Sequence, residues 1–312
     1  MLIACNSDDF LKSIKDKLQN KYKMKDLGKI KQFLGVNVHH KNDKIFLEQS
    51  NFTETLLEKF DFTNAKPIST PVDTSMKLYK SGENEENFNT EIYQSAVGAL
   101  LFLSTRTRPD ICFAVSTVAK YCVNPNKNHW QAVKRIFRYL KGTINLGISY
   151  SKSPNPCVGY SDADFAGDLN DRKSTSGFCF MYGNGIVSWK TQKQTCVSIS
   201  TAEAEYVSLS ICSQEAVWLR KLLLDLKVSD NNPMLIYEDN QSALCLAKNN
   251  KIHGRAKHIS IKFHYVRDMV NTGVIRLQYC PTEDMIADIF TKGLSSARFI
   301  RLRSMLGMSL AK

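Results

Sequence analysis

The second half of this 312-residue chain is predicted to form a mixed α/β fold, with a five-stranded sheet and helices packed on its faces. Two apolar runs flank a Gly183-Asn184-Gly185 turn, which is typical of a β-hairpin. Strand-like and helix-like patterns then alternate to the end of the chain, and such alternation predicts a sheet covered by helices. The predicted strands are 158–167, 176–182, 185–190, Met234–Asp239 and Val274–Tyr279, and the predicted helices are 201–226, 241–248, 260–271 and one from about 283.

The first half is predicted to combine short strands with a group of helices. A polar segment, SGENEENFNT (81–90), is expected to be a flexible loop, and SKSPNP (151–156) is expected to be a linker that divides the chain into domains 1–150 and 151–312. The predicted strands are Met1–Cys5, 33–38 and 44–47. One helix is predicted to begin at Ser7, and further helices are predicted over 52–60, 92–105, 110–123 and 128–141.

Composition limits the classes of partner and compartment. The formal net charge is +12, which favours an anionic partner such as nucleic acid, although a basic surface without such a partner stays open. The nine cysteines are odd in number and none form a CxxC pair, so we expect a reducing intracellular compartment, cytoplasmic or nuclear. No apolar run approaches the roughly 20 residues of a membrane span, and the N-terminus lacks a signal-peptide core.

The strand around Asp162 carries two carboxylates at alternate positions. Asp162 and Asp164 project from the same face of a strand, and Asp is depleted in strands. A bound cation would explain the pair. An exposed edge strand with polar residues facing water would explain it equally well.

Four further acids lie on three other predicted elements. Glu203 matches a capping box with Ser200, whereas Glu205 lies on the apolar stripe of the helix and is expected to face the sheet. Asp239 ends a strand, where ligand sites of α/β sheets commonly lie, but it could instead cap the next helix. Asp288 is unremarkable when taken singly.

Together, the four acids Asp162, Glu205, Asp239 and Asp288 would repel one another unless cations neutralise them. Ligation by oxygen alone fits Mg²⁺ or Mn²⁺ better than zinc. Two such ions could activate a water and stabilise a leaving oxygen in phosphoryl transfer.

Basic residues gather in two places. The helix 128–141 carries Lys134, Arg135, Arg138 and Lys141, which suits contact with a phosphate backbone and equally suits a basic bundle helix. His253, His258 and His264 match no standard zinc spacing. Arg255, Lys257 and His258 are therefore expected to contact phosphate or to cap local structure.

The second half resembles the ribonuclease H domain of copia-type LTR-retrotransposon Pol polyproteins. The resemblance implies a ribonuclease H-like fold with a core of about 156–295, two Mg²⁺ ions, and the metal ligands Asp162 (bridging), Glu205, Asp239 and Asp288. It departs from many ribonucleases H in one respect, since the loop 280–285 has no His. The matching runs are YSDAD (160–164), DRKSTSG (171–177), STAEAEY (200–206), DNQSA (239–243), KHI (257–259) and ADIFTK (287–292).

The first half resembles the C-terminal part of the same family's reverse transcriptase. The matching runs are MKDLG (24–28), FLGV (33–36), TRPDI (107–111) and RYLKGT (138–143). The resemblance implies a palm remnant at 1–65 and a helical thumb-like region at 90–145. The family's Tyr-x-Asp-Asp polymerase motif would precede Met1, so polymerisation by this chain alone is not expected.

The leading hypothesis is therefore a magnesium-dependent endonuclease that cuts the RNA strand of RNA–DNA hybrids, within a Pol polyprotein that supplies its other partners. Two alternatives stay open: a non-catalytic nucleic-acid-binding remnant, and a fragment of a full RNA-directed DNA polymerase.

Overall fold

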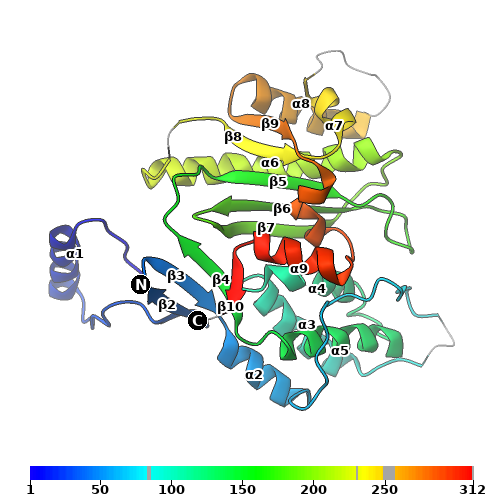
Figure 1. Ribbon diagram of the computed structural model, residues 1–312, viewed down its shortest axis with the longest axis horizontal. Helices are drawn as coiled ribbons and strands as arrows, with labels where there is room; N and C mark the ends of the chain where they lie inside the picture. The colour runs from blue at the N-terminus through cyan, green and yellow to red at the C-terminus, as the bar shows by residue number, and fades with distance from the viewer. Residues whose placement is uncertain (83–85, 230, 249–256, 311–312) are drawn as a thin grey trace.

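The computed structural model describes the chain except residues 83–85, 230, 249–256 and 311–312 (Figure 1). Its helices are α1 (Asp8–Lys21), α2 (Ser50–Lys59), α3 (Thr90–Ser104), α4 (Cys112–Ala119), α5 (Lys127–Lys141), α6 (Thr201–Asp225), α7 (Gln241–Lys248), α8 (Lys257–Asn271) and α9 (Ser296–Met305). The strands are β1 (Gln32–Phe33), β2 (Val36–Lys41), β3 (Lys44–Glu48), β4 (Leu146–Ser151), β5 (Val158–Ala163), β6 (Thr175–Tyr182), β7 (Gly185–Lys193), β8 (Met234–Glu238), β9 (Ile275–Tyr279) and β10 (Met308–Leu310). Short 3-10 helices are η1 (Pro109–Ile111), η2 (Thr282–Asp284) and η3 (Ile286–Phe290).

The second half contains the predicted mixed five-stranded sheet, in the order β7-β6-β5-β8-β9. The first three strands pair antiparallel, while β8 runs parallel to both β5 and β9. The predicted hairpin is confirmed, because Gly183 and Asn184 both adopt the positive φ that a tight turn between β6 and β7 requires. Helix α6 packs along β5 and β6, and its apolar residues, such as Leu209, form a buried core with Phe180 and Ile236.

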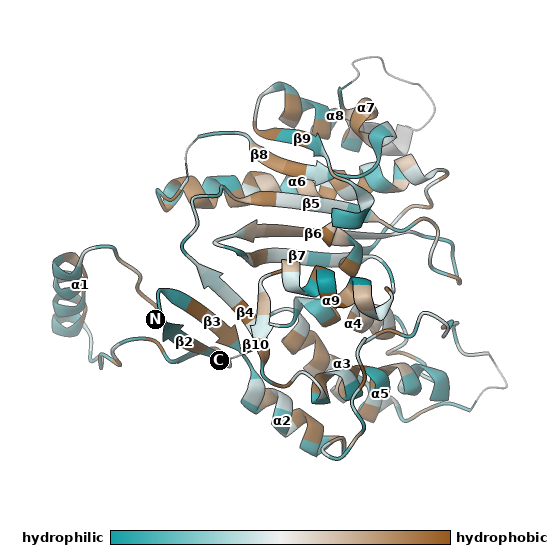
Figure 2. Ribbon diagram, viewed as in Figure 1, coloured by the Kyte–Doolittle hydropathy of each residue, from teal (hydrophilic) through white to brown (hydrophobic). Residues whose placement is uncertain are grey.

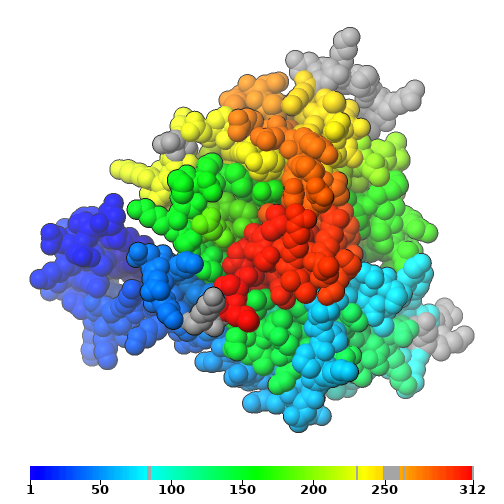
Figure 3. All heavy atoms as spheres, in the orientation of Figure 1, coloured from blue at the N-terminus to red at the C-terminus, as the bar shows by residue number. Residues whose placement is uncertain are grey.

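A second five-stranded sheet, in the order β1-β2-β3-β4-β10, lies in the first half. Its last strand comes from the other end of the chain, since Met308 of β10 pairs with Ile148 of β4. Figure 3 shows this C-terminal segment, coloured red, in contact with elements of both halves. One apolar core cluster likewise includes Leu100 and Phe137 together with Phe290. The division into domains 1–150 and 151–312 stays a prediction.

Polar contacts also join the two halves. The indole nitrogen of Trp189 on β7 donates to the carbonyl oxygen of Ser104 at 2.8 Å. Within the first half, Arg108 is buried and forms a two-pronged ion pair with Asp110, with nitrogen–oxygen distances of 3.0 and 2.9 Å. Such a pair is costly to break, because each partner alone would leave a buried charge.

Helix α1 lies apart from the rest of the molecule in Figure 1, and none of its residues is buried. Its surface is mostly hydrophilic, whereas hydrophobic residues run along β3 and β8 (Figure 2). Among the described residues, no helix is long and apolar enough to cross a membrane.

Several predicted elements differ in the structure. The predicted strand 33–38 is divided into β1 and β2, since Leu34 and Gly35 adopt positive φ in a turn between them. Met1–Cys5 is not a strand, and no strand in the described part of the chain pairs with it. Strand β5 ends at Ala163 and does not continue to 167, since Ala166 adopts a φ of +53° and leaves the extended conformation. The helix predicted from about 283 is replaced by η2 and η3, which the extended backbone of Met285 separates, and α9 begins only at Ser296.

Candidate metal centre

Three of the four predicted carboxylates meet at one edge of the mixed sheet. Asp162 lies near the end of β5, Asp239 directly follows β8, and Glu205 lies in the second turn of α6. One oxygen from each lies within 4.8 Å of the others. The parallel pairing of β5 and β8 brings their ends to the same edge, and α6 crosses beneath them. Asp162 and Glu205 are buried, whereas Asp239 is half-buried and opens the group to solvent.

The start of α6 separates the roles of its two glutamates. The Ser200 hydroxyl accepts from the Glu203 amide at 3.2 Å, and the Glu203 carboxylate accepts from the Ile199 amide at 2.9 Å. The capping role predicted for Glu203 is confirmed, although its carboxylate meets the amide before Ser200 and not that of Ser200 itself. Glu205 faces the sheet as predicted, and its Oε2 is buried without a hydrogen-bond partner.

Asp239 does not cap α7, so that alternative is wrong. The side chain of Asn240 takes this role, because its Oδ1 accepts from the Ala243 amide at 3.0 Å. Asp239 instead accepts a hydrogen bond from the Thr282 hydroxyl at 2.8 Å. This hydrogen bond orients the Asp239 carboxylate at the sheet edge, and Asn240 caps the helix in its place.

Asp288 lies beside the three-carboxylate group and is not part of it. It is fully buried in η3, and the Lys292 ammonium lies 2.6 Å from its Oδ1. Arg298 pairs with its other oxygen, Oδ2. The Lys292 ammonium is also 3.5 Å from Oδ2 of Asp162, which accepts a hydrogen bond from Thr291. Two cationic side chains therefore already compensate Asp288.

Asp164 has a separate position and contact. Its carboxylate accepts a hydrogen bond from the Thr175 amide at the start of β6. Burial raises the pKa of Asp164 to about 6, while the Thr175 contact opposes the rise. This local backbone contact gives Asp164 a hydrogen-bond partner without a metal.

Sequence reasoning missed a fifth acid, Glu238. This residue is fully buried at the end of β8, and its Oε2 has no hydrogen-bond partner. Alternation along the strand offered a signal, because Met234 and Ile236 face the α6 core and Glu238 continues the same face. Lys292 and Arg298 were also missed as partners of Asp288.

Burial and like charges shift the acids toward their neutral forms. Burial raises the pKa of Asp162 to about 7, with Lys292 opposing and Asp288 adding to the rise. Burial raises the pKa of Glu205 well above its usual range, and the nearby charges of Glu238 and Asp162 raise it further. Burial likewise raises the pKa of Glu238.

A divalent cation fits this arrangement. Oxygen ligands from three elements converge, Glu205 has an unpartnered oxygen, and the carboxylates repel one another. All the available donors are carboxylate oxygens, which suit Mg²⁺ and Mn²⁺.

The predicted basic contacts are only partly available. Arg135 pairs with Asp73 at 2.9 Å, and Arg138 donates to the Lys66 carbonyl at 2.9 Å. Both line a shallow groove with Lys134, while Lys141 ends α5 outside it. Arg255 lies outside the described residues, and for Lys257 and His258 only their place at the start of α8 is described. Their nucleic-acid contacts stay predictions.

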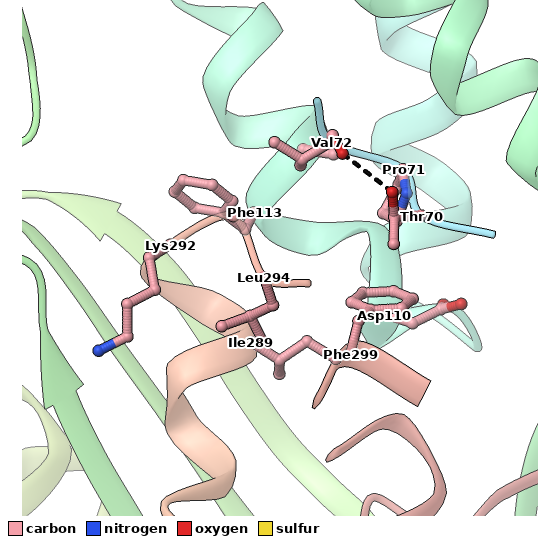
Figure 4. Close-up of a pocket in the computed structure, with 11 residues that line it drawn as sticks. Thr70, Pro71, Val72, Asp110, Phe113, Ile289, Lys292, Leu294 and Phe299 are labelled. Carbon is pink, nitrogen blue, oxygen red and sulfur yellow. Dashed lines mark hydrogen bonds between the residues drawn. The ribbon is translucent and has the colours of Figure 1, made fainter. Parts of the chain in front are cut away.

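A small pocket lies behind Lys292, between η3, α4 and the segment around Pro71. Figure 4 shows the Lys292 side chain extending away from the apolar lining residues Phe113 and Ile289. The aliphatic stem of Lys292 therefore lines the pocket, while its ammonium forms ion pairs with the carboxylates of Asp162 and Asp288.

The strand order of the mixed sheet, with carboxylates at the ends of two parallel strands and on the covering helix, defines a ribonuclease H-like class of fold. Residues 1–74 match the family model described as reverse transcriptase (RNA-dependent DNA polymerase). The chain is 37% identical to the retrovirus-related Pol polyprotein from transposon TNT 1-94 of Nicotiana tabacum, over 99% of this chain and 24% of the polyprotein. It is 30% identical to the putative transposon Ty5-1 protein YCL074W of Saccharomyces cerevisiae, over 67% of this chain and 69% of that protein.

The chain belongs to the family of copia-type retrotransposon Pol polyproteins. The chain spans about a quarter (24%) of the length of the tobacco polyprotein. Among solved structures, LC11-RNase H1, isolated from compost, aligns with 44% of this chain and 93% of its own, at 14% identity and a TM-score of 0.34. That structural likeness is weak.

Proposed function

We propose that this chain is a magnesium-dependent ribonuclease H that hydrolyses the RNA strand of RNA–DNA hybrids. The observation that carries the proposal is the convergence of Asp162, Glu205 and Asp239 within 4.8 Å, with a buried oxygen of Glu205 left unpartnered. Capping and backbone contacts account for Glu203, Asp164 and Asn240, whereas the local contacts of Asp162 and Asp239 do not explain why both lie beside the unpartnered Glu205 oxygen.

Each of the three carboxylates has a defined position in the proposed mechanism. Asp162, Glu205 and Asp239 would hold the divalent ions, with Asp288 beside them. Two ions, Mg²⁺ or alternatively Mn²⁺, would supply an activated water and stabilise the leaving oxygen. Thr291 and Thr282 hold the carboxylates of Asp162 and Asp239 by hydrogen bonds, which fixes their directions before an ion binds.

The proposed substrate agrees with the charge of the chain and with its relatives. A formal net charge of +12 attracts a phosphate backbone without reading its sequence. The half-buried position of Asp239 leaves one side of the centre open to such a polymer. In a complete Pol polyprotein, the remainder of the polyprotein would be the other partner.

The test is cleavage of a hybrid with labelled RNA by the purified chain in Mg²⁺ and in Mn²⁺, with the Asp239→Asn variant beside it. Asp239 makes one side-chain hydrogen bond among the described residues, so the variant is expected to fold normally while losing at least about 100-fold in cleavage rate. Asp225→Asn, on the exposed end of α6, is the matched control and should cleave normally.

Equal cleavage by wild type and Asp239→Asn would contradict the proposed site. Retained binding of the hybrid with no turnover in either metal would instead select the alternative function, a non-catalytic nucleic-acid-binding protein.

A further inference from the structure

Lys292 places a positive charge between two carboxylates of the candidate metal centre. Its ammonium lies 2.6 Å from Asp288 and 3.5 Å from Asp162, which come from η3 and β5. Its side chain is 39% exposed, so the ammonium is reachable from solvent although both carboxylates are buried. A compact ammonium on a flexible stem can leave such a position without disturbing the backbone.

The centre is asymmetric in its cations. Among the residues that the structure describes, Asp288 pairs with both Lys292 and Arg298, and Asp162 with Lys292. Within the same described part of the chain, Glu205 and Asp239 have no cationic side chain at ion-pair distance. Positive charge is thus supplied on the Asp288 side and is lacking on the Glu205 side.

The surroundings of Lys292 keep its charge directed at the centre. The stem of Lys292 lines the small pocket together with Phe113 and Ile289. The next residue in the chain, Gly293, lies close to Val72. In Figure 4 the ammonium points away from that lining. Packing of the stem therefore favours the orientation in which the ammonium meets Asp162 and Asp288.

We propose that Lys292 is a resident cation that occupies the Asp162–Asp288 side of the centre and must be displaced when a second divalent ion binds there. The inference rests on the proposed function, because it assumes that the carboxylates hold metal. The centre then has two unlike positions. An ion between Asp162, Glu205 and Asp239 meets the ammonium only at Asp162, at 3.5 Å, whereas an ion that uses Asp288 must replace the ammonium at 2.6 Å.

The first experiment measures Mn²⁺ binding to the metal-free chain without nucleic acid, by calorimetry and by electron paramagnetic resonance. Wild type should bind one ion tightly and a second weakly. Lys292→Met keeps the length of the stem and removes the charge, and the second ion should bind about tenfold more tightly, as expected for loss of a partly solvated charged contact. Lys292→Arg and the exposed α6 control Lys221→Met should keep the wild-type difference.

The second experiment uses wild type alone, so it does not depend on the folding of a variant. Amine-reactive labelling followed by mass spectrometry measures the accessibility of Lys292 with and without saturating Mg²⁺. Displacement from Asp288 should raise the labelling rate of Lys292, while that of Lys221 stays constant. Unchanged labelling of Lys292, or equal affinity for the second ion in wild type and Lys292→Met, would overturn the proposal.

These outcomes are separable from failure of the proposed function. Binding of Mn²⁺ and labelling of Lys292 are measured without substrate, whereas the proposed function fails in the hybrid-cleavage assay. Mn²⁺ binding that is the same in wild type and Lys292→Met, together with cleavage of the hybrid, would refute the role of Lys292 alone, whereas absence of Mn²⁺ binding in both proteins would refute the role of Lys292 and the proposed function together.

Discussion

Asp162→Asn is expected to stabilise the metal-free protein at alkaline pH and to flatten its pH dependence. Asp162 is 1% exposed, and its pKa rises from 3.8 in the unfolded chain to about 7 on folding, chiefly because of burial. The folded state therefore binds more protons than the unfolded state between these values. The stabilising contribution of the neutral carboxyl is complete below the unfolded pKa and is lost as pH rises through about 7.

The magnitude follows from the two pKa values. The difference between 3.8 and about 7 corresponds to on the order of 4 kcal/mol of lost stability at pH 8. This cost already includes the opposing effects of Lys292 and Thr291, and an uncharged Asn avoids it but is a weaker acceptor for the Thr291 hydroxyl. We therefore expect a net gain of about 2 kcal/mol at pH 8 and almost none at pH 5.

The assay is urea unfolding in EDTA at pH 5 and pH 8, with wild type, Asp162→Asn and the exposed control Asp225→Asn. Wild type and the control should both lose stability at the higher pH, and part of that loss should remain in Asp162→Asn because Asp164 has a pKa of about 6. Saturating Mg²⁺ should restore wild type at pH 8 and leave the variant unchanged. An identical pH dependence of wild type and Asp162→Asn would refute the reasoning.

Two further predictions concern the packing of Gly177 beside the centre and the buried ion pair of Arg108 in the first half. In Gly177→Ala, the new Cβ would lie 2.6 Å from Thr291 and 2.7 Å from Phe290, so we expect a loss of about 1–3 kcal/mol in unfolding free energy. The control Gly98→Ala places its Cβ in open space within α3 and should gain about 0.5–1 kcal/mol in unfolding free energy. In Arg108→Met, the buried Asp110 loses its partner, and chemical denaturation should show a loss of about 3–5 kcal/mol, against at most about 0.5 kcal/mol for the exposed Arg106→Met. A stable Gly177→Ala, or equal losses for the two arginine variants, would contradict these packing assignments.

Local chemistry explains which elements were predictable. The capping of α6 by Ser200 and the turn at Gly183 and Asn184 depend on neighbouring residues, so short-range patterns identify them. The helix predicted from about 283 fails for a tertiary reason. Its residues pack as η3 against β5 and β6 around the buried Asp288, and this packing overrides the helical pattern.

The candidate site was predictable only in part. The inward direction of Glu205 follows from the periodicity of one helix, and its burial agrees with that expectation. The choice between the two roles of Asp239 required the structure, because Asn240 next to it is an equally good cap by residue type. Asp288 belongs to the predicted set but lies outside the three-carboxylate group.

The sequence by itself determined the order of the strands and helices around the site, the acids that they carry and the family of the chain. Only the tertiary structure decided how charges are distributed among those acids. Asp162 and Lys292 are 130 positions apart, and β10 meets β4 across an even longer separation. Contacts of this range leave no periodic pattern in the chain, since burial and charge compensation depend on elements that meet only when the whole molecule folds.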